Sequence, residues 1–508
     1  MTETVQKRAV KNTLVGLLSF VISLLSAFIT VPILLSKWGN ETYGVWLALF
    51  AGYTMLQSLD NGHINYVGNK LNVLYHKDIL ASQKVLGSSL LISFILGSVQ
   101  LLIAFVLIFT NKLKVVFGIN VLAAQSATLN TGLIILLLVW IIFGSFGGIL
   151  HRLMIPVGLM YQSQWWGILY SFTQLLSIII TVISGGSILD VCIVYALVQA
   201  FVYTLTFIYI KNKIPLFFPW WKLKDWKTAF SNFGKSLVLT INNIIQQLGN
   251  SGLILFIANL FSVATIPVFT TLRTITNSAG SITNVFITSL VPDLVRYHAN
   301  GEGRKVLATQ NANWFITGSI INLGILIIMP FIEALYVLWT KGHLGFNFQL
   351  FLFLVASISF LSFGTGLNTY IKSINDLFSQ TVIIFTRVIL IFLFSYLFIT
   401  SLGIASVGLG ILISELVSSV ILPVYFVNKI INTFSVKFNI QLILLLLLPS
   451  VLLTGISLIY LAGFEKIIIL SSVALLSDLI IYLLIWFRLD IELKDMMKYT
   501  FQNMFTKN

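Results

Sequence analysis

Charged residues are scarce in this chain of 508 residues. Lys and Arg number 30, Asp and Glu number 16, and together they make up 9% of the sequence, against about a quarter in an ordinary soluble protein. Hydrophobic residues make up 58%. This composition excludes a soluble enzyme and a disordered protein. It predicts a chain whose residues mostly face lipid or one another.

Patterns for disulfides, metal sites and nucleotide hydrolysis are also lacking. Cys192 is the single cysteine, so an intramolecular disulfide is excluded. The five histidines are scattered, and none stands at metal-ligand spacing from cysteine or a carboxylate. Phe233–Ser236 resembles the end of a phosphate loop, but Ala229 replaces the first glycine of that motif. We therefore expect no metal, no cofactor and no enzymatic activity.

Long apolar runs are what the chain has in abundance. Windows of about 20 mostly apolar residues, the length needed to cross a bilayer, predict about fourteen transmembrane helices. The runs do not alternate apolar and polar residues as barrel strands do, so the predicted fold class is an all-α polytopic membrane protein. The second, eighth and tenth spans are polar enough that hydropathy alone leaves them doubtful. The predicted spans are residues 12–36, 43–69, 85–110, 127–150, 163–183, 188–210, 235–258, 266–290, 309–331, 347–371, 379–400, 404–427, 439–461 and 467–487.

The basic residues are distributed unevenly between the predicted loops. If the N-terminus is cytoplasmic, 22 of the 30 Lys and Arg lie in segments on the cytoplasmic side and 5 on the opposite side, in agreement with the positive-inside rule. This distribution predicts an even number of spans with both termini in the cytoplasm. The net charge of +14 therefore reflects topology, and we expect no nucleic-acid partner.

A weak internal repeat predicts two similar halves. Lys11–Val15 at the start of the first span matches Gly234–Val238 at the start of the seventh, and the pattern of spans and loops continues in phase. We predict two six-helix lobes in parallel repeat, followed by two C-terminal helices. The predicted boundaries are 1–210 for the N-lobe, 211–234 for a cytoplasmic linker, 235–427 for the C-lobe, and 428–508 for spans 13 and 14 with a cytoplasmic tail.

The linker interleaves Lys with aromatic residues around Trp220, Trp221 and Trp226. Two interpretations stay open. The linker either holds the headgroups of anionic membrane lipids or is an interfacial segment anchored by its aromatic side chains.

Arg273 lies in the predicted eighth span, in the polar run TTLRTITNSAGSITN. An unpaired guanidinium in hydrocarbon costs about 3 kcal/mol on insertion scales, so we expect this run to face a wet cavity. Arg273 is either a fixed cation that binds an anionic substrate group such as a diphosphate, or half of an ion pair with a carboxylate such as Glu415. Arg387, at the start of the eleventh span, is expected to reach the membrane interface.

Two carboxyls within the predicted spans are candidates for ion coupling. Asp60 in the second span is either a gating or proton-linked carboxylate, or a cap where Gly62 lets the helix bend. Glu415 in the twelfth span stands in apolar surroundings, where burial disfavours the charged form. Asp478, in the fourteenth span, is likewise a single carboxylate in apolar surroundings, but it lies outside the repeated lobes.

The predicted seventh span carries a stripe of amides. Asn243, Gln246, Gln247 and Asn250 share one helical face, which in lipid must point inward. The stripe either holds helices together or lines a lumen that binds sugar hydroxyls. Tyr53 in the second span is a candidate to stack on a sugar ring, although aromatic residues more commonly pack in the core. The candidate substrate-binding residues are Arg273, Asn243, Gln246, Asn250, Asp60 and Tyr53.

The first two predicted spans resemble those of a known family. Residues Val31–Trp46 read VPILLSKWGNETYGVW, and Ser58–Gly62 reads SLDNG. A proline-containing first helix, a short loop ending in Tyr-Gly, and an Asp-x-Gly at the inner end of the second span are similar to the opening of the polysaccharide transporter family, which includes O-antigen and capsule flippases. That family belongs to the multidrug/oligosaccharidyl-lipid/polysaccharide (MOP) exporter superfamily.

The resemblance implies a flippase in the bacterial cytoplasmic membrane that moves an undecaprenyl-diphosphate-linked oligosaccharide from the inner to the outer leaflet by alternating access. Arg273 would then contact the diphosphate or acidic sugars, and glycan polymerase or assembly proteins would be partners. Three alternatives stay open. They are a multidrug or organic-cation antiporter of the same superfamily, which needs an acidic cavity; a lipid II flippase, whose relatives usually carry charged residues in the first span; and a non-transporting scaffold of a glycan assembly complex.

Overall fold

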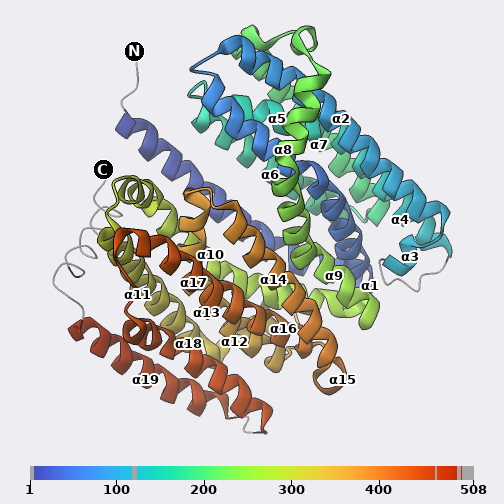
Figure 1. Ribbon diagram of the computed structural model, residues 1–508. Helices are drawn as coiled ribbons and strands as arrows, with labels where there is room; N and C mark the ends of the chain where they lie inside the picture. Colours follow the sequence, from blue (N-terminus) through green and yellow to red (C-terminus); the bar gives the residue numbers. More distant parts are fainter. Residues whose placement is uncertain (1–4, 117–122, 464–465, 489–493, 495–508) are drawn as a thin grey trace. The chain divides into compact units, whose positions relative to one another are not determined.

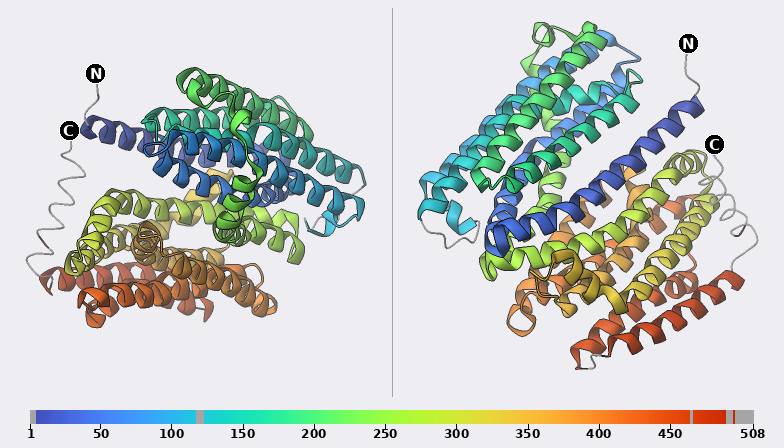
Figure 2. Two further views of the ribbon diagram at one scale, coloured as in Figure 1. Left: turned by 45° about the horizontal axis from the view of Figure 1, so that its top comes forward. Right: turned by 180° about the vertical axis from the view of Figure 1, so that it is seen from behind.

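Long helices build the protein in the computed structural model, which describes residues 5–116, 123–463, 466–488 and 494 (Figure 1). Among these described residues there is no β-strand. The helices form two compact units, Met1–Pro267 and Val268–Asn508. Figure 2 shows from two more sides that the long helices within each unit lie side by side. The predicted all-α fold class is confirmed.

All fourteen predicted spans coincide with helical segments. Ten segments of the described chain are long and apolar enough to cross a membrane, including the predicted tenth span. The first and second spans lie in α1, the seventh in α8 and α9, and the eighth in α10. α1, α8 and α10 are more polar than the other long helices. The chain is therefore a multi-pass membrane protein.

The first unit is organised around α1 (Val5–Leu74), which Gly39 divides into two helices. Gly39 has a φ of 71°, in the left-handed region where a Cβ would be strained. α1 packs against α2, α6 and α8. The other elements of this unit are α2 (Ile79–Phe109), α3 (Leu113–Val116), α4 (Ala123–Val139), η1 (Trp140–Ser145), α5 (Phe146–Leu153), α6 (Met160–Ile183), α7 (Ile188–Lys213), η2 (Pro215–Phe217), η3 (Trp220–Leu223), α8 (Trp226–Gln247), η4 (Leu248–Gly252), α9 (Leu253–Leu260) and η5 (Val263–Thr265).

Close backbone contact joins α1 to α8. A Cβ on Gly62 would lie 2.2 Å from Cα of Thr240, so only glycine permits this approach. Small residues at helix contacts are the usual device in membranes, where lipid is as apolar as the side chains and packing holds helices together. Gly62 therefore serves close packing and does not bend α1, which runs without a break beyond Gly39.

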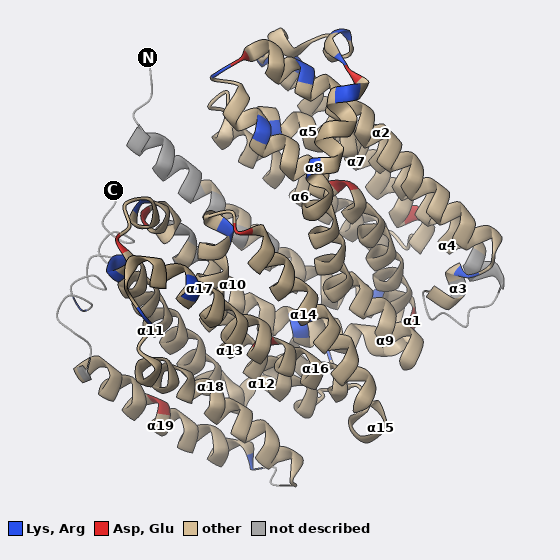
Figure 3. Ribbon diagram, in the orientation of Figure 1, with Lys and Arg blue, Asp and Glu red and all other residues tan. Residues whose placement is uncertain are grey.

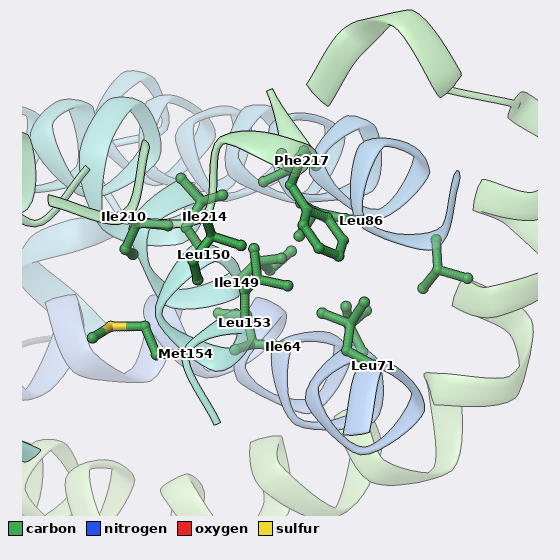
Figure 4. Close-up of a cluster of buried hydrophobic side chains, with 13 residues drawn as sticks. Ile64, Leu71, Leu86, Ile149, Leu150, Leu153, Met154, Ile210, Ile214 and Phe217 are labelled. Atoms are coloured by element: carbon green, nitrogen blue, oxygen red, sulfur yellow. The ribbon is translucent and has the colours of Figure 1, made fainter. Parts of the chain in front are cut away.

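A cluster of buried aliphatic side chains fixes one end of the first unit (Figure 4). Ile64 and Leu71 of α1 meet Leu86 of α2, and these pack against residues of α5, α7 and η2. The members of α5 are Ile149, Leu150 and Leu153, followed by Met154 directly after the helix. This packing sets the positions of the polar and basic residues that the same helices carry.

The second unit surrounds α13 (Phe348–Ser373), which packs against α11, α14, α16 and α18. Serines such as Ser357 and Ser359 on α13 are buried, and this predicted tenth span, which hydropathy alone leaves doubtful, is apolar enough to cross a membrane. The other elements are α10 (Ile266–Ala299), α11 (Gly303–Ile328), η6 (Met329–Phe331), α12 (Ile332–Thr340), α14 (Leu377–Leu397), α15 (Ile399–Leu402), α16 (Ala405–Glu415), η7 (Leu416–Ile421), α17 (Leu422–Ile431), η8 (Asn432–Phe434), α18 (Ile440–Leu461) and α19 (Ile467–Arg488).

Candidate functional site

In the described part of the chain, three short π-helical segments interrupt the long helices: η1, η4 and η7. Such segments widen the helix by one residue and are frequent at functional sites. Each of the three adjoins polar residues singled out from the sequence: η1 adjoins Asp60, η4 contains Asn250, and η7 directly follows Glu415. Hydropathy carries no signal for a π segment, so the sequence could not reveal them.

Asp60 is fully buried in the first unit. One carboxylate oxygen, Oδ2, accepts a hydrogen bond from Nε1 of Trp140 on η1 at 3.2 Å. Gln100 of α2 and Ser145 of η1 lie beside the carboxylate. Both side chains are within hydrogen-bonding reach of the carboxylate, although among the described residues no hydrogen bond of standard geometry reaches Oδ1 of Asp60. Buried groups of this kind need water, an ion or a proton to satisfy them.

The interpretation of Asp60 as a helix-breaking cap is wrong, because it lies in an uninterrupted part of α1. Tyr53, two turns earlier, is 1% exposed. Its hydroxyl donates to Oε1 of Gln199 on α7 at 3.2 Å, and its ring lies 5.8 Å from that of Phe50. Tyr53 therefore occupies the core of the first unit. Stacking of Tyr53 on a sugar stays a prediction, which this burial disfavours.

The amide stripe on α8 and η4 divides between two environments. Gln247 donates to Oγ of Ser251 at 2.6 Å, and Ser251 is hydrogen-bonded to Thr54 of α1 at 2.9 Å, so this part joins two helices. Gln246 and Asn250 are exposed. Asn243 is partly buried, and its Nδ2 donates to the carbonyl of Leu239. Both interpretations of the stripe therefore stay open: Gln247 joins two helices, whereas Gln246 and Asn250 are exposed.

Arg387, Glu415 and Arg273 form a charged group in the second unit. Arg387 on α14 is ion-paired with Glu415 on α16, and the Glu415 side chain is 2% exposed. Oγ of Ser419 on η7 donates to the other carboxylate oxygen at 2.5 Å. Arg273 on α10 lies near enough to interact electrostatically with both Arg387 and Glu415. Two guanidinium groups thus share one carboxylate, and the group keeps a net positive charge.

The surroundings of Arg273 combine an aromatic ring with hydroxyls. The guanidinium lies over the ring of Phe269, 5.6 Å from its centroid, and Arg273 is partly buried. Thr274, Thr276 and Ser278 donate to main-chain carbonyls three or four residues earlier. These bonds satisfy hydroxyl groups inside the helix, so the polar run is compatible with a buried face as well as with a wet one. Asn277, one turn beyond Arg273, is exposed.

The linker packs on α2. Lys84 is paired with Asp225 at 3.1 Å, and the main-chain N–H of Asp225 donates to Oγ of Ser88 at 3.0 Å. Asp225 caps α8 by accepting from the main-chain N–H and the hydroxyl of Thr228. These hydrogen bonds and the neighbouring Lys84 hold the pKa of the Asp225 carboxyl well below its usual range. Trp221 is 53% exposed, as both interpretations of the linker require.

No protein-family model and no curated protein matches the chain. Solved structures do match it. The lipid II flippase MurJ in its inward closed conformation aligns with a TM-score of 0.65 and 13% identity, covering 93% of this chain and 97% of MurJ. An inward-facing multidrug resistance MATE family transporter of the MOP superfamily aligns at 0.62 and 15%, covering 81% and 95%. The MATE multidrug transporter DinF-BH aligns at 0.62 and 16%, covering 86% and 98%. The chain therefore has the fold of these membrane transporters.

Proposed function

We propose that the chain is a flippase that moves a lipid-diphosphate-linked oligosaccharide across the bacterial cytoplasmic membrane by alternating access. The observation that carries this proposal is the net positive charge of the group formed by Arg273, Arg387 and Glu415. A diphosphate offers oxygens that a guanidinium binds in a bidentate manner.

The sugar part of the substrate would meet amides and hydroxyls. Gln246 and Asn250 of the first unit are exposed side chains on membrane helices. Such groups donate to and accept from sugar hydroxyls without carrying charge. Asn243, Gln246 and Asn250 therefore remain our candidates for sugar contacts, and Arg273 our candidate for the diphosphate.

Coupling to an ion gradient would use Asp60. It is fully buried, and within the described residues no hydrogen bond of standard geometry reaches its Oδ1, so a proton or a monovalent cation would satisfy it. Glu415 also remains a candidate, but Arg387 already neutralises it. Because Glu415 already has an ion-pair partner, we place Asp60 first.

The organic-cation antiporter is the main competing function, because the matching structures include multidrug transporters. An antiporter for cations needs an excess of carboxylates at its site. The group in the second unit has the opposite balance, with two guanidinium groups and one carboxylate. A scaffold of a glycan assembly complex, the second competing function, would transport neither lipid nor cation.

Proteoliposomes distinguish these functions. The purified chain is reconstituted with a fluorescent polyprenyl-diphosphate oligosaccharide, and its appearance in the opposite leaflet is followed by quenching from outside. Uptake of a labelled organic cation is followed in parallel vesicles. Flipping of the lipid without cation uptake is the expected result. Cation uptake alone indicates the antiporter, and the absence of both indicates the scaffold. The remaining alternative is a lipid II flippase. It is tested in the same assay with labelled lipid II, which such a flippase would move and the proposed flippase would not.

Anionic lipids are proposed as partners of the linker, where Trp221 and Trp226 are exposed beside Lys222, Lys224 and Lys227. Positively charged juxtamembrane segments are attracted by about 1 kcal/mol per Lys or Arg to an anionic surface. With the predicted topology this segment would face the cytoplasmic leaflet.

A further inference from the structure

A carboxyl group without a counter-ion lies inside the second unit. Asp478 is the single acidic residue in the sequence of α19, where its neighbours on both sides are apolar, and Figure 3 shows this acidic stretch in the middle of the helix. Asp478 is 0% exposed. Among the described residues no hydrogen bond reaches either of its carboxylate oxygens, and none of the ion pairs there includes it. A negative charge on this group would therefore stay uncompensated.

The buried side of α19 carries this carboxyl. Ser471, Ala474, Asp478, Tyr482 and Ile485 follow one another at intervals of three or four residues and are all buried, so they share one face of the helix. α19 packs against α11 and α18. The carboxyl of Asp478 therefore lies between α19 and these neighbours, away from lipid.

Tyr482, one turn beyond Asp478, joins α19 to a buried chain of hydrogen bonds. Its hydroxyl oxygen accepts from Nδ2 of Asn322 on α11 at 3.0 Å. Oδ1 of Asn322 accepts from Oγ of Ser359 on α13 at 2.5 Å, and Ser359 is hydrogen-bonded to Ser450 on α18 at 2.6 Å. Four helices of the second unit are thus connected through polar side chains.

Ser450 and Asp478 lie at the same depth among these helices. α18 ends at Leu461 and α19 begins at Ile467, so the two helices, which pack on each other, run in opposite directions. Ser450 stands about three turns before the end of α18, and Asp478 about three turns after the start of α19. The carboxyl of Asp478 is therefore level with the chain of hydrogen bonds.

This chain of hydrogen bonds leaves few oxygens for a metal ion. The Ser359 hydroxyl already donates to Oδ1 of Asn322, and Asn322 donates to the Tyr482 oxygen. Hard cations are held by several oxygen ligands at once, and no group of side chains suited to a metal is found among the described residues. A proton needs a single carboxylate oxygen, and Asp478 offers two without a partner.

Other titratable groups on the packed elements lie far along the helices. Arg304 and Lys305 stand at the start of α11, about 25 Å along the axis from the residue that is bonded to Tyr482. Tyr460 stands in the last turn of α18, and η6, which also contacts α19, has no titratable side chain. Tyr482 is therefore the titratable group that faces Asp478.

We propose that Asp478 is a proton-binding site, at which the carboxyl carries a proton while α19 is packed in the second unit. A buried carboxyl without a cation is far less costly as the neutral acid than as the anion. Release of the proton would place an unpaired charge between α19 and α11, which membrane helices tolerate poorly. The packing of α19 then depends on the proton. This site is separate from Asp60, which belongs to the other unit, and the inference holds whatever lipid the protein moves.

Infrared difference spectroscopy of the full-length protein in detergent tests the proposal, because the C=O stretch of a protonated carboxyl is separate from the bands of carboxylates. Spectra of wild type and Asp478→Asn are compared at neutral pH. The substitution is expected to remove one protonated-carboxyl band. Asp190→Asn, at the exposed start of α7, is the control and is expected to remove none. If Asp478→Asn leaves the protonated-carboxyl bands unchanged, the proposal is overturned.

Asparagine imitates the protonated side chain, so Asp478→Asn is expected to fold and to melt at the temperature of wild type at neutral pH. A variant that fails to fold would show that the anion is required, which also overturns the proposal. In alkaline buffer the melting temperature of wild type is expected to fall more than that of Asp478→Asn, because wild type alone acquires a charge at this position. Equal falls would contradict the dependence of α19 packing on the proton.

Sodium is the competing occupant of the site, and it is tested on the same infrared band. Sodium chloride is added to wild type at constant pH, with choline chloride at the same ionic strength as the control. The protonated-carboxyl band is expected to persist in both salts. Loss of the band in sodium alone would show that the site takes a sodium ion and that its assignment to a proton is wrong.

Discussion

Arg387 on α14 forms an ion pair with Glu415 on α16, inside the second unit, where the Glu415 side chain is 2% exposed. Glu415 was one of the carboxylates that the sequence offered as a partner for Arg273. Because Glu415 is already paired with Arg387, Arg273 adds a second positive charge beside the Arg387–Glu415 pair. The proposed recognition of a diphosphate depends on this excess of one cation.

Breaking this pair from one side should destabilise the protein. Arg387→Ala leaves the carboxylate of Glu415 buried without its cation, which typically costs about 3–5 kcal/mol in unfolding free energy. Arg387→Gln combined with Glu415→Gln removes both charges and should recover most of the loss. Thermal unfolding in detergent measures both. Equal melting temperatures for wild type and Arg387→Ala would show that the pair contributes nothing.

Asp60→Asn should uncouple transport from the ion gradient. The substitution keeps the shape of the side chain but removes the carboxylate that we propose takes up a proton or cation. We expect flipping driven by an imposed proton or sodium gradient to fall to the rate without a gradient, while substrate binding is retained. Asp190→Asn, at the exposed start of α7, is the control. A gradient response in Asp60→Asn equal to that of wild type rules Asp60 out as the coupling residue.

Gly62→Ala should separate α1 from α8. The added Cβ would lie 2.2 Å from Cα of Thr240, and backbone cannot yield as a flexible side chain can. Overpacking of this kind costs about 1–3 kcal/mol. Gly167→Ala in α6 is the matched control, because nothing lies within 4 Å of its Cβ position and alanine favours a helix. A lower melting temperature is expected for Gly62→Ala alone, and equal effects of the two substitutions would contradict the close packing.

The junction between linker and α8 should loosen in acid. Hydrogen bonds from Thr228 and the neighbouring Lys84 hold the pKa of Asp225 well below its usual range. Because the folded pKa is lower than the value of about 3.9 in an unfolded chain, Asp225 stabilises the junction above about pH 4, and this contribution is lost as the pH falls toward the folded pKa. Hydrogen exchange of residues 220–230, corrected for intrinsic rates, should rise below pH 4. Asp225→Asn should abolish this dependence, and an unchanged pH profile would contradict the role of Asp225.

The sequence predicted the membrane helices well because an apolar run of about 20 residues has few other uses. α13, which the sequence leaves doubtful because of its serines, is among the helices apolar enough to cross a membrane. Its serines are satisfied within the bundle, as when Oγ of Ser359 donates to Oδ1 of Asn322 on α11 at 2.5 Å. The repeat between the two halves and the topology of the termini stay predictions.

Pairings between helices could not be predicted in the same way. Arg387 was expected at the interface, yet it reaches Glu415, 28 residues further along the chain. The contact of Asp60 with Trp140 likewise spans 80 residues and depends on a π segment. Such contacts depend on how the helices are rotated against each other, and hydropathy reports only that a segment is apolar.

Flipping of a polyprenyl-diphosphate oligosaccharide by Arg273 variants tests the central claim most directly. The rate is measured in proteoliposomes for wild type, Arg273→Ala and Arg273→Lys, with Arg296→Ala as control, because Arg296 lies on the same helix as an exposed cation paired with Asp293. We predict that Arg273→Ala loses at least about tenfold in rate, that Arg273→Lys retains part of it because the charge remains without the bidentate geometry, and that Arg296→Ala flips normally. Wild-type rates in both Arg273 variants would contradict the account.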